Sequence, residues 1–411
     1  MTILLRRTRG AFRWMGSAWI IVGLTLLAIL LLEGSLCFLF FVKDMMAGGT
    51  MPDPRVIAEG YGGATWPIRH YHELERLSER WEPYVYFRQH SFAGQTITID
   101  ERGFRRTWQS PRHPTKDSDH QPFRVWMFGG SSLWGFGARD DWTIPSLVAQ
   151  KIHEHGIPAI VGNFSEIGYV STQEVVAMVR ALQAGDHPDL VIFYDGVNES
   201  TSALLEGEAG LTTNERNRRA EFNIRQSPSR LGASLIGRLV GDSATYRLAQ
   251  SIGHRLLNPK GPEGVLPGPG RRQELVDQVV RRYQANLAIV EQLGRGFGFH
   301  SLHFWQPMVF AKKQTVPFES EAAEKLAWAR PFLLEVYEAV RVSDGLRNVP
   351  RFHDLSRVFD EHPGLVFIDY CHTTEAGNEV VAESVAREAI EALEALGRGP
   401  HRGDAAATGV R

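Results

Sequence analysis

Short apolar runs alternate with longer segments of helical pattern from residue 124 onward. The apolar runs, each bounded by turn residues, are 125–128, 159–161, 190–194, 302–305 and 365–368. Runs of this length between helical segments are typical of strands in a parallel sheet with helices on both faces. The pattern therefore predicts an α/β fold, a three-layer α/β/α sandwich around a five-stranded parallel sheet.

Two additions to this sheet are predicted from the same patterning. Runs 84–87 and 96–100 alternate apolar and polar residues between turn signals, which predicts a β-hairpin before the sheet. A stretch of about residues 200–290 contains two helical patterns and a Pro/Gly cluster at 259–270, so it is predicted to be a helical insertion. That insertion either shapes a substrate pocket or adds only a packing layer.

The N-terminal region is the most apolar part of the chain. Residues 14–42 are almost wholly apolar, and Arg6, Arg7, Arg9 and Arg13 precede them. Residues 14–32 would span roughly 28 Å as a helix, close to the thickness of a bilayer core. The basic flank predicts a cytoplasmic N-terminus and a chain that lies outside the membrane from residue 45. The run is longer than the apolar core of a signal peptide, and residues 44–47 lack a small residue at the −3 position, so we favour an uncleaved anchor.

Glu33 interrupts this apolar run, and it is expected near the far interface of the membrane. If Glu33 instead lies within the bilayer, its carboxyl needs a polar or protein-facing environment, which would indicate a membrane partner.

These patterns divide the chain into consecutive regions. We expect a cytoplasmic N-terminus at 1–13, a transmembrane anchor at 14–42, a linker at 43–65, a hairpin region at 66–120, a folded domain at 121–396 and a disordered tail at 397–411.

Composition narrows the function classes. The 411 residues are 43% hydrophobic, enough for one large core or two modest ones. A formal net charge of −2 leaves no global basic field of the kind that nucleic-acid binders use, so no nucleic-acid partner is expected. Cys37 lies in the apolar segment, away from Cys371, so no disulfide framework is expected.

Polar residues follow four of the predicted strands. The first strand leads into Gly129-Gly130-Ser131, where glycines allow a sharp turn that exposes a hydroxyl. This is neither the Gly-x-Ser-x-Gly elbow nor a phosphate-binding loop. Polar clusters at 163–169, 194–199 and 369–372 follow the second, third and fifth strands. Because ligands bind outside the carboxyl ends of parallel strands, these groups are expected to converge on one edge.

The residues in these clusters fit acyl transfer. Ser131 would attack a carbonyl carbon, His372 would accept and return its proton, and Asp369 would orient the imidazole. The oxyanion would meet the backbone N–H of Ser131, the backbone N–H of Ser165 and the side-chain amide of Asn198.

Other arrangements of the same residue types are weaker. Asp117 and His120 have the same spacing as Asp369 and His372, but they precede the first strand in a polar loop and are read as solvated. His300 and His303 border the fourth strand without a nearby carboxylate or cysteine pattern, so no metal is expected. Cys371 lacks an adjacent basic partner of the right geometry and is read as a packed residue.

At these positions the sequence resembles the SGNH (GDSL-like) hydrolase superfamily, over about residues 124–390. Ser131, preceded by Gly130 where the family block has Asp, is similar to the Ser block. Asn198 matches the Asn of Gly196-Val197-Asn198-Glu199, and Asp369 and His372 match the Asp-x-x-His block. The second block departs from the family because Ser165 stands where its oxyanion Gly is expected, and Gly168 is an alternative in a shifted register.

The resemblance implies a flavodoxin-like sandwich and a serine esterase without a cofactor or metal. The expected substrate is an O-acylated, for example acetylated, glycan or lipid outside the cytoplasmic membrane. Two other functions stay open: an O-acyltransferase that uses the same acyl-enzyme, and a non-catalytic module of an envelope complex.

Overall fold

The computed structural model describes residues 2–46, 61, 63–110, 121–225, 243–246, 248, 266–324, 326–349 and 351–397. The chain forms two compact units. One contains Met1–Pro52 and Asn217–Glu263, and the other contains Asp53–Arg216 and Gly264–Arg411.

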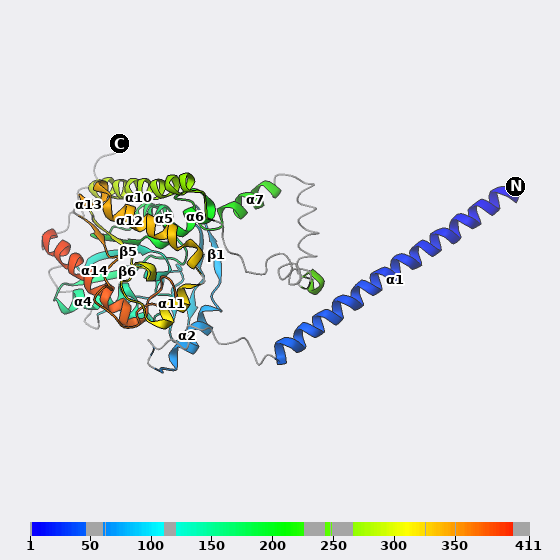
Figure 1. Cartoon of the computed structure of the whole chain (residues 1–411), viewed down its shortest axis with the longest axis horizontal. Coiled ribbons are helices and arrows are strands. Elements are labelled where there is room, and N and C mark those ends of the chain that lie inside the picture. The colour runs from blue at the N-terminus through cyan, green and yellow to red at the C-terminus, as the bar shows by residue number, and fades with distance from the viewer. Residues whose placement is uncertain are drawn as a thin grey trace. The chain divides into compact units, whose positions relative to one another are not determined.

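A five-stranded parallel sheet forms the centre of the second unit, with strand order β6-β5-β7-β8-β9 (Figure 1). Its strands are β5 (Phe123–Gly129), β6 (Ala159–Asn163), β7 (Leu190–Asp195), β8 (His300–Trp305) and β9 (Phe352–Asp354). The chain forms β5 first and adds β6 on one side of it. It then crosses to the other side of β5 and adds β7, β8 and β9 in turn. This confirms the predicted α/β class and its parallel sheet.

The fifth strand is not the one predicted from the sequence. Residues 365–368 contribute only an isolated bridge between Phe367 and Thr373, and the shorter β9 occupies the edge of the sheet. The N–H groups of Val366 and Phe367 donate to the buried carboxylate of Glu319, at 2.9 and 3.0 Å, instead of to a neighbouring strand. Most of this apolar run is buried, but two of its N–H groups bond to a side chain, while the Ile368 N–H donates to the carbonyl oxygen of His372 at 2.9 Å.

Helices cover both faces of the sheet, and the alternation of side chains along β5 shows why. Val125 and Met127 pack into the cluster formed with α4 (Ile144–Glu154) and α14 (Glu375–Leu396), whereas Trp126 and Phe128 pack on the opposite face. That opposite face is covered by α5 (Ser171–Gln183) and α10 (Pro269–Phe297), with α12 (Arg330–Val342) beside α10. Other described α-helices of the second unit are α2 (Trp66–Leu74), α3 (Ser131–Trp134), α6 (Val197–Glu206), α11 (Pro317–Glu324) and α13 (Asp344–Arg347).

The predicted hairpin before the sheet consists of two separate antiparallel ribbons. The first pairs β1 (Glu79–Glu82) with β2 (Tyr86–Gln89), and the second pairs β3 (Phe92–Ala93) with β4 (Thr98–Ile99). The two apolar runs thus lie in different ribbons and do not pair with each other. Each run pairs with a strand that precedes it by less than about ten residues. The alternation of apolar and polar residues predicts that a segment is a strand, but not which strand it pairs with.

The predicted insertion is only partly described. Helix α6 ends at Glu206, α7 spans Glu215–Arg225, and α10 begins at Pro269. Most of the helical pattern at 231–257, the Pro/Gly cluster at its end and the tail after residue 397 lie outside the described residues.

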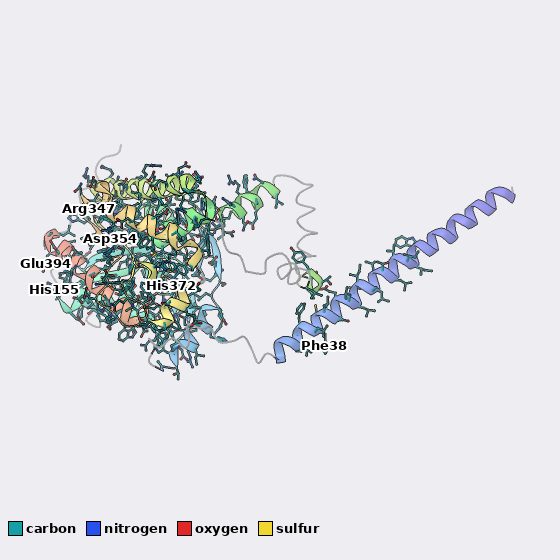
Figure 2. All side chains as sticks on the ribbon, viewed as in Figure 1. Phe38, His155, Arg347, Asp354, His372 and Glu394 are labelled. Carbon is teal, nitrogen blue, oxygen red and sulfur yellow. The ribbon has the colours of Figure 1, made fainter. Side chains whose placement is uncertain are left out.

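In the first unit, helix α1 (Thr2–Met46) contains a stretch, Trp19–Val42, that is long and apolar enough to cross a membrane. A signal sequence would pass the same test of length and composition. The side chains of this stretch, including Phe38, project from the helix without being buried in the protein (Figure 2).

Glu33 lies inside this stretch, and its position relative to a membrane interface stays a prediction. Its carboxylate accepts hydrogen bonds from the backbone N–H of Ala244, from the N–H of Thr245 at 3.1 Å and from the Thr245 hydroxyl at 2.7 Å. The polar partner of Glu33 therefore belongs to the same chain.

Candidate active site

The serine turn follows the end of β5. The chain leaves β5 at Gly129, Gly130 caps the short helix α3, and Ser131 is the first residue of that helix. A side chain at Gly129 would lie 2.8 Å from the carbonyl oxygen of Tyr194, so the close approach of β7 requires glycine there. The turn places Ser131 at the carboxyl end of β5, where the residue is half-buried.

Three side chains form a continuous hydrogen-bonded chain at this edge. Ser131 Oγ lies 2.7 Å from His372 Nε2, and His372 Nδ1 lies 2.7 Å from Asp369 Oδ2. The second carboxylate oxygen of Asp369 accepts from the backbone N–H of Cys371 at 3.0 Å and of His372 at 2.8 Å. The carboxylate is thus fixed by the same tight turn that carries the imidazole. Figure 2 labels His372 within the folded unit.

The electrostatics of the pair follow from burial and charge. Burial alone would lower the pKa of His372, but the negative charge of Asp369 outweighs it and raises the pKa above the ordinary value. Burial also opposes ionisation of Asp369, but the charge of His372 and the hydrogen bonds hold the pKa of the carboxyl at about 2. Asp369 is therefore a carboxylate at neutral pH, and it stabilises the imidazolium that forms when His372 takes a proton.

Asn198 brings a side-chain amide to the serine turn. Its Nδ2 atom donates one hydrogen bond to the carbonyl oxygen of Tyr169, at 2.7 Å, and the amide is only half-buried. A Cβ atom placed on Gly130 would lie 2.2 Å from this Nδ2 atom. Asn198 therefore sits directly against the backbone of Gly130, and its second N–H is available to an oxygen bound at Ser131.

Ser165 does not fit the oxyanion role that the sequence suggested. Its backbone N–H donates to Asn163 Oδ1 at 3.2 Å, its hydroxyl also bonds to that oxygen, and the residue is buried. Both of its donors are therefore directed at Asn163. Gly168 has a backbone with φ +80°, is half-exposed, and has open space where a side chain would stand. The geometry favours Gly168, in the shifted register, over Ser165.

Two contacts at the site, one from an aromatic ring and one from a carboxyl group, were not anticipated from the sequence. Phe136, just after α3, stacks on His372 with ring centroids 4.5 Å apart. Glu199 accepts from the N–H of Ser171 at 2.6 Å and from the N–H of Gly196 at 2.7 Å, so it joins the Asn198 turn to the start of α5. Its position next to Asn198 in the motif was the only available signal.

A cluster of buried acids lies behind the Asn198 turn. Burial raises the pKa of Glu174, Asp195 and Glu199, and their mutual repulsion contributes to the shifts of the first two. Among the described residues, the carboxyl oxygens of Glu174 and Asp195 form no hydrogen bond of ordinary geometry, although the Tyr283 hydroxyl interacts with Asp195. Such a pair is stable in the interior when it shares a proton.

Among the described residues, His303 is not part of a group of ligand atoms close enough to hold an ion. His303 is buried and stacked on Phe193, and burial lowers its pKa to about 3. Within the described part of the chain, the ligand atoms of Asp369, Cys371 and His372 are the group close enough to hold an ion. Burial raises the pKa of the Cys371 thiol, so a thiolate ligand is disfavoured. Asp117 and His120 lie outside the described residues.

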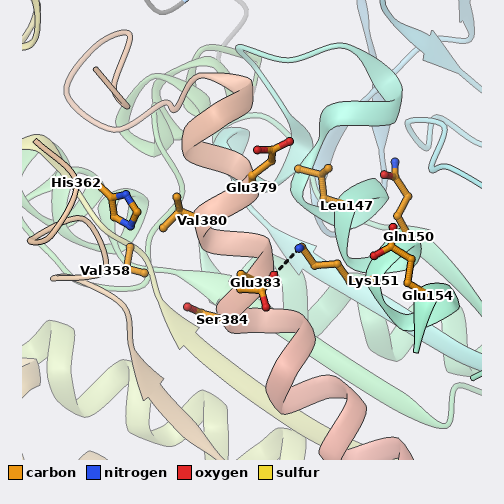
Figure 3. Close-up of a pocket in the computed structure, with 10 residues that line it drawn as sticks. All are labelled: Leu147, Gln150, Lys151, Glu154, Val358, His362, Glu379, Val380, Glu383 and Ser384. Carbon is orange, nitrogen blue, oxygen red and sulfur yellow. Dashed lines mark hydrogen bonds and ion pairs between the residues drawn. The ribbon is translucent and has the colours of Figure 1, made fainter. Parts of the chain in front are cut away.

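A described pocket lies elsewhere. It has a volume of about 640 Å³ and lies between α4 and α14, where Lys151 and Glu383 form an ion pair across it (Figure 3). Its lining contains none of the three residues of the hydrogen-bonded chain.

Comparison with known proteins gives matches only among solved structures; no family model and no curated protein matches the chain. The chain is similar to an acetyl xylan esterase at 14% identity, over 65% of this chain and 99% of that one, with a TM-score of 0.36. It is similar to a lipolytic protein of the G-D-S-L family from Desulfitobacterium hafniense at 10% identity, over 64% and 98%, with a TM-score of 0.34.

A third similar structure is the C-terminal catalytic domain of peptidoglycan O-acetyltransferase A from Streptococcus pneumoniae. The identity is 12%, the match covers 66% of this chain and 96% of that domain, and the TM-score is 0.31. At such identities and scores the likeness says nothing about residue roles or substrate, so the roles below rest on the geometry of the site.

Proposed function

We propose that this chain is a serine acyl hydrolase that cleaves an ester of an O-acylated glycan or lipid. The observation that carries the proposal is the unbroken chain from Ser131 through His372 to Asp369, with 2.7 Å at each link. A serine hydroxyl is a weak nucleophile unless an adjacent base accepts its proton, and a base needs a third group to orient it. All three groups stand at the carboxyl edge of one sheet.

The steps follow from these contacts. Ser131 Oγ attacks the ester carbonyl carbon while His372 Nε2 takes its proton, and the charge that develops on the carbonyl oxygen meets the Asn198 amide and backbone N–H groups at Ser131 and Gly168. The tetrahedral intermediate collapses, His372 returns the proton to the leaving alcohol, and the acyl group stays on Ser131. Water activated by His372 then releases the carboxylic acid.

An acyl-enzyme of this kind also supports transfer to a sugar hydroxyl, because the acceptor alcohol replaces water in the second half of the reaction. The alternative of a non-catalytic envelope module predicts that Ser131 is unreactive. Labelling of the full chain with a fluorophosphonate probe, abolished in Ser131→Ala, supports the proposal. Absence of labelling in folded protein would refute it. Release of free acetate, compared with transfer to a glycan acceptor, distinguishes hydrolase from transferase.

We also propose that α1 anchors the chain in the cytoplasmic membrane with the N-terminus inside and the catalytic unit outside. The basic residues before the apolar stretch support this orientation. Protease added to intact spheroplasts is expected to digest the part after residue 45 and to leave a short N-terminal fragment. Full protection of the chain contradicts the orientation, and loss of that fragment from mature protein indicates a cleaved signal.

A further inference from the structure

Large aromatic side chains stand exposed at the tip of the β1–β2 ribbon. Trp81 is 69% exposed and Tyr84 is 81% exposed, although aromatic residues of this size are usually covered. The Trp81 and Tyr86 rings lie 5.7 Å apart and are tilted by 54°. The tip therefore presents a small aromatic surface to solvent, which we call the aromatic tip, defined by Trp81, Tyr84 and Tyr86.

The backbone of this tip is held in a strained conformation. Tyr84 and Tyr86 have φ values of +67° and +73°, a region in which residues other than glycine are disfavoured by about 1 kcal/mol or more. Val85 between them is fully buried, and its carbonyl oxygen accepts a hydrogen bond from Gln173 at 2.9 Å. Burial of Val85 and this bond from α5 fix the turn and leave Tyr84 exposed, whereas Tyr86 is half-buried and its hydroxyl donates to Glu215 at 3.2 Å.

The same ribbon is fastened to the loop that forms the oxyanion side of the candidate site. The Tyr169 hydroxyl donates to the carbonyl oxygen of Phe87, and the Gln89 N–H donates to Glu166 at 3.1 Å. Tyr169 is also the residue whose carbonyl oxygen holds the Asn198 amide. Trp81 pairs with Phe87 across the ribbon, so the aromatic tip is linked to the oxyanion donors through Phe87 and Tyr169.

The charges of β1 indicate what kind of ligand suits this surface. Arg80 donates to the carbonyl oxygens of Glu101 and Arg102, at 3.0 and 2.8 Å, and Glu82 is paired with Arg180. The basic groups of β1 and of its partner on α5 are thus engaged, and Glu79 adds an exposed negative charge. An anionic lipid surface is recruited by spare Lys and Arg, so this surface favours a neutral ligand.

We propose that Trp81 and Tyr84 bind the sugar rings of a neutral glycan whose acylated residue lies at Ser131. The C–H face of a sugar ring with equatorial substituents is apolar and slightly positive, which complements the negative face of an aromatic ring. A strained, preorganised tip loses little entropy when such a ring stacks on it. The inference rests on the proposed function and narrows its substrate class from a glycan or lipid to a neutral glycan. The ribbon contacts Tyr169, which holds Asn198, and not Ser131 itself. We therefore expect the aromatic tip to bind only substrates long enough to reach both the tip and Ser131.

Binding is tested first, in the full chain held in nanodiscs and inactivated by Ser131→Ala. Partly O-acetylated cellohexaose is the probe, and its Kd is measured by microcalorimetry. Trp81→Ala and Tyr84→Gly should each weaken binding about tenfold or more. Tyr84→Gly also suits the positive φ, so its loss cannot be attributed to unfolding. Phe297→Ala is the matched control, because Phe297 is an exposed aromatic residue at the end of α10. It lies just before the amino end of β8, whereas Ser131 lies at the carboxyl ends of the strands. Equal binding by Trp81→Ala and the parent chain would overturn the proposal.

Kinetic measurements then test glycan binding by the aromatic tip separately from the proposed esterase activity. The kcat/KM for acetylated cellohexaose, divided by that for p-nitrophenyl acetate, should fall about tenfold in Trp81→Ala through KM and should be unchanged in Phe297→Ala. An unchanged ratio in Trp81→Ala refutes glycan binding by the aromatic tip while esterase activity stands. Failure of the parent chain to cleave either ester, with binding still dependent on Trp81, refutes the esterase but keeps the glycan surface. Dependence on Trp81 only for long-chain esters in vesicles would overturn the glycan in favour of lipid.

Discussion

Replacing Gly130 by alanine should lower the turnover of the proposed enzyme, because the new methyl group displaces the side-chain amide of Asn198. The added Cβ would lie 2.2 Å from Asn198 Nδ2 and 3.3 Å from its Cγ, whereas non-bonded heavy atoms settle at roughly 3.5 Å. The amide must therefore move by about 1 Å or more. Its hydrogen bond to the Tyr169 carbonyl oxygen, at 2.7 Å, is then broken or strained.

The magnitude follows from what the amide is expected to do. Loss of one oxyanion donor in a serine hydrolase lowers kcat by about 10² to 10³. The fold should survive, because φ −82° and ψ −158° at Gly130 are accessible to alanine and an N-cap change from Gly to Ala destabilises by less than about 1 kcal/mol. Gly130→Ala should thus lose about 10² in kcat at an unchanged KM, with a melting temperature within a few degrees of the parent chain.

A double-mutant cycle distinguishes this explanation from a direct effect on Ser131. Initial rates on p-nitrophenyl acetate are measured for Gly130→Ala, Asn198→Ala and the combination. Asn198→Ala alone should lower kcat by about 10², and adding Gly130→Ala should change little more, because the displaced group is already absent. If the two losses instead multiply, the alanine perturbs something other than Asn198, and the assignment of the amide to the oxyanion is wrong.

Three further outcomes test the rest of the site. Asp369→Asn removes the charge that raises the pKa of His372, so the acid limb of the pH profile of kcat/KM should shift to lower pH while kcat falls by about 10⁴. Ser165→Ala should keep kcat within about tenfold, because it removes only the hydroxyl, which is directed at Asn163; a loss of 10² would make the Ser165 hydroxyl a working donor. Burial raises the pKa of Glu174, so the folded state retains a proton that the unfolded chain releases above about pH 4, and stability should decline as pH rises. Thermal melts of Glu174→Gln should show a shallower decline between pH 5 and 9, and an unchanged slope would contradict the shared proton.

The central sheet was predictable because its signal is local. Strands β5, β6, β7 and β8 are largely apolar segments of five to seven residues between turn signals, and each of the four corresponding predicted runs falls within an observed strand. The fifth strand could not be located in the same way. Residues 365–368 are as apolar as a buried strand, but whether their N–H groups bond to a strand or to Glu319 depends on a residue 47 positions away. An apolar run reports burial and not the partner of its backbone.

The candidate site also has a part that is local in sequence and a part that is not: the Asp369–His372 pair and the oxyanion donors, respectively. The base half is compact in sequence: Asp369, Cys371 and His372 form one turn in which the carboxylate accepts two N–H groups and the imidazole. An Asp-x-x-His spacing therefore carries most of its geometry. The remaining requirement, a serine 2.7 Å from His372, did not follow from the strand order, because residues 365–368 before Asp369 are not a strand of the sheet. Only the position of Ser131, at the carboxyl end of β5, follows from the sheet.

The oxyanion half, in contrast, is assembled from segments far apart in the chain. Asn198 is held by Tyr169, and the loop of Tyr169 is in turn held by the carbonyl oxygen of Phe87 in β2. None of these contacts leaves a spacing that could be recognised, so the register between Ser165 and Gly168 had no sequence-level solution. Our preference for Gly168 rests on two observations: Ser165 donates to its neighbour Asn163, whereas Gly168 has a positive φ and open space around it. A ribbon that precedes the sheet by more than thirty residues thus positions one side of the site, and changes at β1–β2 are expected to reach the reaction through the oxyanion donors before they reach the base.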